Sequence, residues 1–149
     1  MALSPLGVVH MSAASLALLT GATQLVRRPR DQVHRRIGYA YVGAMVLNNV
    51  TALGIYQFTG RPNLFHSFAV YSLFCVGMAL RPMLTTPRPR QWLRIHYMWM
   101  TWSYVGLWAA TVVEFLTRVV LLPGWLAAVI GSPLVILTGW PLVNRFAPA

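Results

Sequence analysis

Five apolar runs dominate the sequence, and each is long enough to cross a bilayer as a helix, which takes about twenty residues. The runs cover residues 3–26, 37–58, 64–84, 93–117 and 125–143. The connections between them are short and rich in arginine, proline and glycine, as is typical of tight turns at a membrane interface. No soluble domain fits between the runs. The pattern therefore predicts one integral membrane domain, all-α, that takes in residues 1–149.

Composition agrees with a membrane protein. Of the 149 residues, 57% are hydrophobic and only 9% are charged, and the mean hydropathy is +0.58, which is too apolar for a soluble domain of this size. The first run carries its positive charges after the apolar residues, so we expect a retained helix and not a cleaved signal peptide. No phosphate-binding loop, carboxylate pair or Ser-His-Asp arrangement is found, and we predict no catalytic residue.

The basic residues predict how the chain sits in a membrane. Twelve basic residues against two acidic ones give a net charge of +10. The arginines cluster at the ends of the apolar runs, so the expected partner is the lipid bilayer and not nucleic acid. Arg61 and Arg118 fall on one side and ten arginines on the other, which predicts the N-terminus outside and the C-terminus in the cytoplasm of a bacterial-type inner membrane. The ten are Arg27, Arg28, Arg30, Arg35, Arg36, Arg81, Arg88, Arg90, Arg94 and Arg145.

Short connections make sequential helices antiparallel neighbours. The first four helices are therefore predicted to form an up-down four-helix bundle, with the fifth helix packed outside it. In such a bundle the first and third helices are diagonal to each other, and so are the second and fourth.

Each of the first four predicted helices carries one histidine, and a histidine inside a membrane span is a functional candidate. His10 and His66 lie near the outer ends of their helices. His34, three residues after the expected N-cap Asp31, and His96 lie near the inner ends. A single four-histidine metal site is excluded by depth, because His10 is sixteen residues from the end of its run, or about 24 Å. Two pairs remain: His10 with His66, and His34 with His96.

The predicted spacing suits a planar cofactor. Diagonal helices of a bundle lie roughly 12–14 Å apart, which leaves room for a porphyrin ligated on both faces, whereas a zinc site wants more ligands. Gly21 and Gly77 each follow the histidine of their own helix by eleven residues. They would face the inner pair and let a porphyrin edge approach the backbone. Glycines at such positions also serve membrane helix packing, and this alternative stays open.

Four segments, in order, carry a family resemblance: HMSAASLALLTGATQLVRRP, QVHRRIGYAYVG, NLFHSFAVYSL and RIHYMWMTWSYVGL. Together they resemble the di-haem cytochrome b family reduced by ascorbate or quinol (cytochrome b-561-like). The resemblance implies a membrane oxidoreductase in which His10 and His66 ligate an outer b haem and His34 and His96 an inner one. The segments HRRIGYAYVGAM and HYMWMTWSYVGLWAA also resemble a bacterial family of predicted membrane proteins of unknown function (DUF2306-like), which implies no activity.

Three functional hypotheses follow. The first is transmembrane electron transfer through one or two b haems, with a quinone as a plausible partner. The second is a cofactor-free accessory or structural subunit of a larger membrane complex. The third and weaker one is a proton or solute transporter that uses Glu114 and the histidines.

Two further polar groups have structural interpretations. Glu114 and Arg118 are four residues apart on one predicted helix, the spacing of an intrahelical ion pair. Asn48, Asn49 and Thr51 lie near the middle of the second run, where hydrogen bonds to neighbouring helices are expected.

Overall fold

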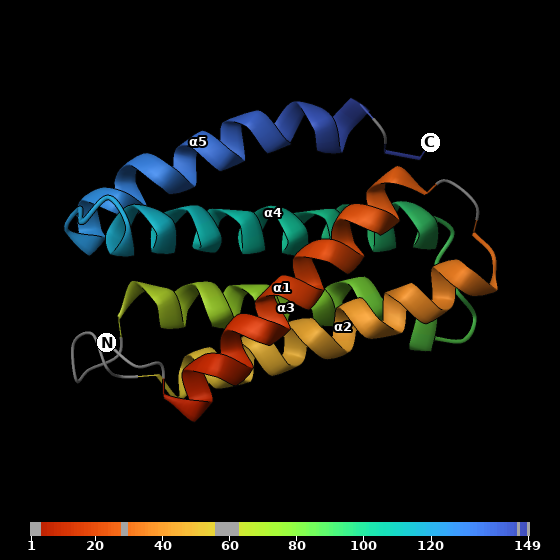
Figure 1. Cartoon of the computed structure of the whole chain (residues 1–149). Coiled ribbons are helices and arrows are strands. Elements are labelled where there is room, and N and C mark those ends of the chain that lie inside the picture. The colour runs from red at the N-terminus through yellow and green to blue at the C-terminus, as the bar shows by residue number, and fades with distance from the viewer. Residues whose placement is uncertain (1–3, 28–29, 56–62, 146, 149) are drawn as a thin grey trace. The chain divides into compact units, whose positions relative to one another are not determined.

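The structure is a computed structural model that describes residues 4–27, 30–55, 63–145 and 147–148. Within these residues the chain is all-α, with five helices and no strand (Figure 1). The helices are α1 (Pro5–Val26), α2 (Gln32–Leu53), α3 (Leu64–Leu84), α4 (Trp92–Arg118) and α5 (Gly124–Arg145). Each predicted apolar run thus overlaps one helix, but the second prediction was wrong at its end, because α2 stops at Leu53 with Gly54 as its C-cap. Residues 56–58, expected to end the second helix, lie outside the described residues, as do Arg28 and Arg61.

Capping residues explain where the helices begin. The Ser4 side chain accepts a hydrogen bond from the backbone N–H of Gly7 at 3.1 Å, and Asp31 accepts one from the N–H of His34 at 2.9 Å. The predicted cap at Asp31 is confirmed. This cap provides an acceptor for a backbone N–H group in the first turn of α2. The helix can therefore begin at polar residues, ahead of the apolar run that was expected to start at residue 37. At the start of α4, by contrast, the N-cap Gln91 makes no side-chain capping bond.

Three of the described helices are long and apolar enough to cross a membrane: α1, α3 and the part of α5 from Gly124 to Pro141. Helices α2 and α4 have 22 and 27 residues and so measure about 33 and 40 Å. Their composition is more polar, because α2 contains Arg35, Arg36 and an asparagine pair and α4 has charged residues near both ends. Of the five predicted spans, composition therefore supports three.

The chain divides into two compact units, residues 1–73 and 74–149, and α3 runs across the division. In the first unit α1 and α2 form an antiparallel hairpin (Figure 1). The buried face of α1 consists of Ala13, Ala17 and Gly21, which are spaced four residues apart and therefore share one side of the helix. Small residues at this spacing let two membrane helices approach closely.

In the second unit α4 and α5 lie side by side (Figure 1). Two glycines of α5 permit this packing. A Cβ atom on Gly131 would lie 3.2 Å from a methyl group of Val112 and 3.3 Å from one of Val113, and a Cβ on Gly139 would lie 3.0 Å from a methyl group of Val105. The side chains of α4 thus occupy the space that larger residues on α5 would need.

Candidate functional site

His10 lies in the second turn of α1 and reaches α2. Its Nδ1 is 3.0 Å from the backbone oxygen of Asn48 and 3.1 Å from the hydroxyl oxygen of Thr51. A carbonyl oxygen can only accept, so Nδ1 of His10 carries a proton and donates. The Thr51 hydroxyl donates to the backbone oxygen of Leu47 at 2.7 Å, which leaves its own oxygen as an acceptor for His10. Neutral His10 consequently holds its lone pair on Nε2.

His96 repeats this arrangement in the second turn of α4. Its Nδ1 lies 3.0 Å from the backbone oxygen of Ala79 in α3, so Nδ1 donates and Nε2 carries the lone pair. Metal-binding histidines commonly donate the second ring N–H to a backbone carbonyl, which fixes the tautomer and the ring orientation. His10 and His96 both donate a ring N–H to a backbone carbonyl in this way.

His66 lies in the first turn of α3 and is only 8% exposed. Its Nδ1 is 3.2 Å from the backbone nitrogen of Asn63 and 3.1 Å from the side-chain oxygen of the same residue. The backbone N–H requires a lone pair on Nδ1, whereas the side-chain oxygen requires a proton there, so the two contacts call for opposite tautomers. Only the tautomer with the proton on Nδ1 leaves a lone pair on Nε2 for a metal.

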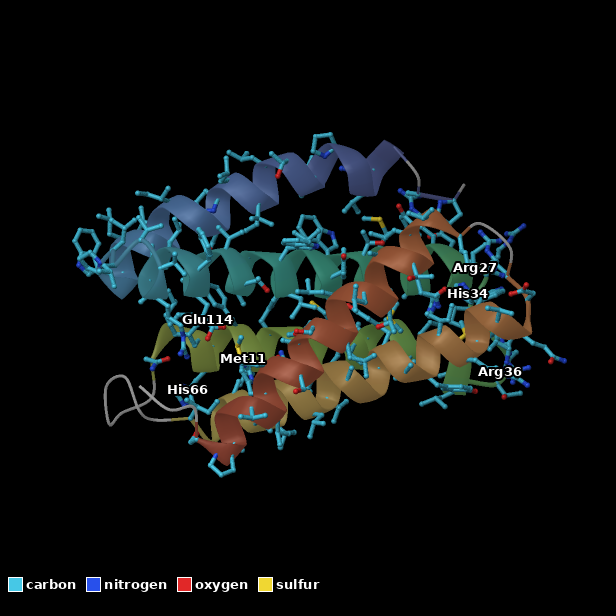
Figure 2. All side chains as sticks on the ribbon, in the orientation of Figure 1. Met11, Arg27, His34, Arg36, His66 and Glu114 are labelled. Atoms are coloured by element: carbon cyan, nitrogen blue, oxygen red, sulfur yellow. The ribbon has the colours of Figure 1, made fainter. Side chains whose placement is uncertain are left out.

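His34 lies in the first turn of α2, and its backbone makes two hydrogen bonds there. Its N–H donates to Asp31, and its backbone oxygen accepts a hydrogen bond from the Gln24 side chain at 2.7 Å. Figure 2 shows His34 beside Arg27 at the connected end of the α1–α2 hairpin, and His66 at the opposite end of the same unit. The two histidines assigned to different haems are therefore well separated within this unit.

The small residues near the histidines differ in their surroundings. Gly38, one turn after His34, makes room for Gln24, because a Cβ at Gly38 would lie 3.2 Å from the Gln24 amide nitrogen. Gly21 is buried on α1. Gly77 is exposed on α3, and a Cβ there would meet no atom within 4 Å among the described residues. Close packing inside the described part of the chain does not explain this glycine.

The predicted interhelical contacts are confirmed for Asn49 and Thr51, whereas Asn48 is contacted through its backbone oxygen and its buried side-chain oxygen has no hydrogen-bond partner among the described residues. Asn49 donates from its side chain in α2 to the Ser72 hydroxyl in α3 at 3.0 Å, and Thr51 joins α2 to α1 through His10. In the second unit Glu114 and Arg118 form the expected ion pair at 2.8 Å. This ion pair does not show whether Glu114 takes part in transport, so the transporter hypothesis stays a prediction.

The described residues contain no group of three or more His, Cys, Asp or Glu side chains that could hold a metal ion. A haem held between two histidines uses only two protein ligands, fewer than such a group. In the tautomers assigned to His10 and His96, Nε2 carries the lone pair that an axial ligand of haem iron needs. His66 meets this requirement in one of its two tautomers.

The comparison with known families identifies the class of protein. Residues 7–147 match the profile of the family described as "Predicted membrane protein (DUF2306)". The chain belongs to this family. No curated protein and no solved structure matches the chain. Membership in DUF2306 confirms the second resemblance and the membrane class, while the description of the family names no cofactor, partner or activity. The cytochrome b-561-like resemblance stays a prediction.

Two polar residues of this DUF2306 chain contribute to the site and were not singled out from the sequence. Gln24 holds the start of α2 through the backbone of His34, and Ser72 accepts from Asn49. Both are polar residues inside apolar runs, which is a usable signal. Their partners depend on how the helices face each other, and the sequence pattern does not contain that information.

Proposed function

We propose that this membrane protein is a transmembrane electron carrier that holds one or two b-type haems between paired histidines. His10 and His66 would ligate one haem, and His34 and His96 the other. One observation carries the proposal: Nδ1 of His10 and Nδ1 of His96 each donate to a backbone oxygen of a neighbouring helix.

This hydrogen bond matters because iron binds the lone pair of an imidazole. An Nδ1–H held by a carbonyl keeps the lone pair on Nε2, raises its basicity and stops the ring from rotating. A haem with two imidazole ligands supplies a one-electron redox centre that has no open position for oxygen. The chain's own residues would orient the rings and keep water away. A quinone is the class of lipid-soluble partner that suits such a carrier.

The proposal also requires that α2 and α4 cross the membrane together with the three apolar helices. Their lengths are sufficient, and their polar residues include ones that form hydrogen bonds or ion pairs with protein groups, which lowers the cost of placing them in a bilayer. The ten arginines on one side support an inner-membrane orientation with the C-terminus in the cytoplasm.

Replacing His10 by asparagine tests the proposal. The amide nitrogen of asparagine can take the place of Nδ1 and donate to Asn48, but asparagine has nothing at the position of Nε2. We expect His10→Asn and His96→Asn each to lose one of two haems while helicity is unchanged; if the protein holds a single haem, only the variant of the pair that ligates it should lose it. The measurement is the absorption spectrum and pyridine haemochrome of the full chain purified from membranes.

Thr51→Val is the matched control. It removes one acceptor of the His10 N–H but keeps the imidazole and the bond to Asn48, so haem content should be retained. A folded wild-type protein without a Soret band would contradict the proposal.

That contradicting result would favour a cofactor-free subunit of a larger membrane complex. The same hydrogen bonds support this second function, because His10 ties α1 to α2 and His96 ties α4 to α3. In that case His10→Asn should preserve the stability of the protein and His10→Ala, which lacks a donor, should lower it. Thermal unfolding of the two variants in detergent distinguishes these outcomes.

A further inference from the structure

The connection between α3 and α4 carries a concentration of positive charge. Its arginines, all exposed, lie between the last turn of α3 and the first turn of α4, and we call residues 81–94 the basic segment. They are Arg81, Arg88, Arg90 and Arg94. The basic segment contains no acidic residue.

The rest of the chain offers this segment no carboxylate side chain. The sequence has only two acidic residues. Asp31 pairs with Arg27 at 2.8 Å, and Glu114 pairs with Arg118 at 2.8 Å. Because both acidic side chains already pair with other arginines, neither of them neutralises the basic segment, and its exposed arginines are available to an external anion.

Local structure orients Arg88, the central arginine of the connection. The guanidinium group of Arg88 lies over the indole ring of Trp92 at 5.2 Å from its centroid, an arrangement that orients the planar group. Pro87 and Pro89 flank Arg88 and restrict the backbone there. Arg94 lies in the first turn of α4, where the helix dipole disfavours a cation. A bound anion would relieve that repulsion.

We propose that the basic segment binds the phosphate headgroup of an anionic phospholipid through Arg88, Arg90 and Arg94. Guanidinium groups pair with phosphate through two parallel hydrogen bonds. A lipid is the expected source of the phosphate because α3, whose apolar residues suffice to span a membrane, ends at Leu84 within the segment. This position is at headgroup level, where tryptophans such as Trp92 are also favoured.

The connection between α1 and α2 provides an internal comparison. It is also basic, but it contains Asp31, which pairs with Arg27 and caps α2. Its other exposed arginines include Arg30, Arg35 and Arg36. A general attraction to an anionic surface would act on both connections alike, whereas a specific site would involve only the basic segment.

The test is a titration of the full chain, purified in an uncharged detergent, with dioleoylphosphatidylglycerol or dioleoylphosphatidylcholine, followed by native mass spectrometry. Each arginine near an anionic surface contributes about fivefold to binding, so R88Q/R90Q/R94Q should weaken phosphatidylglycerol binding about 100-fold. The matched control R30Q/R35Q/R36Q removes the same charge and should weaken it by less than about tenfold. Circular dichroism establishes that both triple variants keep their helices.

A charge-preserving variant separates a site from bulk attraction. R88K/R90K/R94K should still lose about tenfold, because lysine does not form the paired, planar contact with phosphate. Unchanged binding in this variant, equal losses in the two glutamine variants, or equal binding of the two lipids would each overturn the proposal. Displacement of phosphatidylglycerol by millimolar inorganic phosphate would assign the site to free phosphate and overturn the lipid assignment.

Discussion

The contact between α4 and α5 in the second unit differs from the hydrogen-bonded contacts of the first unit. In the first unit, directional hydrogen bonds link the helices: His10 to the backbone of Asn48, and Asn49 to Ser72. In the second, α5 meets α4 through close packing at Gly131 and Gly139 and through two tryptophan rings, Trp102 and Trp140, whose centroids are 5.6 Å apart.

The difference shows what each kind of contact can do in a membrane. Lipid tails are as apolar as leucine, so helices associate through close packing and hydrogen bonds and not through the hydrophobic effect. At α5 the contact with α4 includes close packing and a pair of aromatic rings. Hydrogen bonds also fix the rotation of a side chain, as they do for the ring of His10. His96 follows the same rule within the second unit, because it donates to the backbone of Ala79.

The largest effect is expected from filling the packed face of α5. Gly139→Leu should lower the free energy of unfolding by about 2–3 kcal/mol, because the new side chain collides with Val105. Gly106→Ala is the control, since a Cβ there meets no described atom within 4 Å, and it should stabilise the helix by about 0.5 kcal/mol. Both can be measured by unfolding in sodium dodecyl sulfate.

Val105→Ala in the Gly139→Leu background should restore part of the loss, because it opens space beside the leucine. If Gly139→Leu is as stable as the wild type, packing does not hold α5 on α4 and the comparison between the two units fails.

A smaller effect is expected in the hydrogen-bonded unit. Asn49→Ala and Ser72→Ala, combined in a double-mutant cycle, should give a coupling energy of about 0.6 kcal/mol, the usual value for a hydrogen bond between membrane helices. The readout is the same unfolding titration. A coupling near zero would show that Asn49 is stabilised by its bond to the backbone of Met45 and not by the interhelical contact.

The smallest effect concerns the exposed cap of α2. The hydrogen bond from the backbone N–H of His34 lowers the pKa of Asp31 below its ordinary value of 3.8, and Arg27 adds to this. A lowered pKa in the folded protein means that ionised Asp31 stabilises the fold above pH 3.8, and that this contribution disappears as the pH falls below that value.

Thermal unfolding at pH 6 and pH 3 should therefore show a greater acid loss for the wild type than for Asp31→Asn. Asparagine is the right control because it caps a helix nearly as well but does not titrate. Asp31 is exposed, so the difference should be only about 1–2 °C. The same acid loss in both proteins would contradict the assigned role of the carboxylate.

The helices and their caps could be predicted because they depend on local sequence. Apolar length predicted every helix, and Asp31 could be identified as a cap from its position before the arginines. Helix α2 starts earlier than expected because the Asp31 cap stabilises a first turn made of polar residues. A search for apolar runs leaves such residues out of the helix. The i,i+4 pair of Glu114 and Arg118 was predictable for the same local reason.

The membrane class, the five helices of the described residues and one histidine on each of the first four could all be predicted before any fold was known. These follow from composition, from helix length and from residue spacing within a single element. The fold was needed to show which nitrogen of His10 and of His96 carries the proton, and which residues Gln24 and Asn49 contact. Those outcomes depend on the backbone oxygens and hydroxyl groups of a neighbouring helix, whose rotation results from packing between elements distant in the chain.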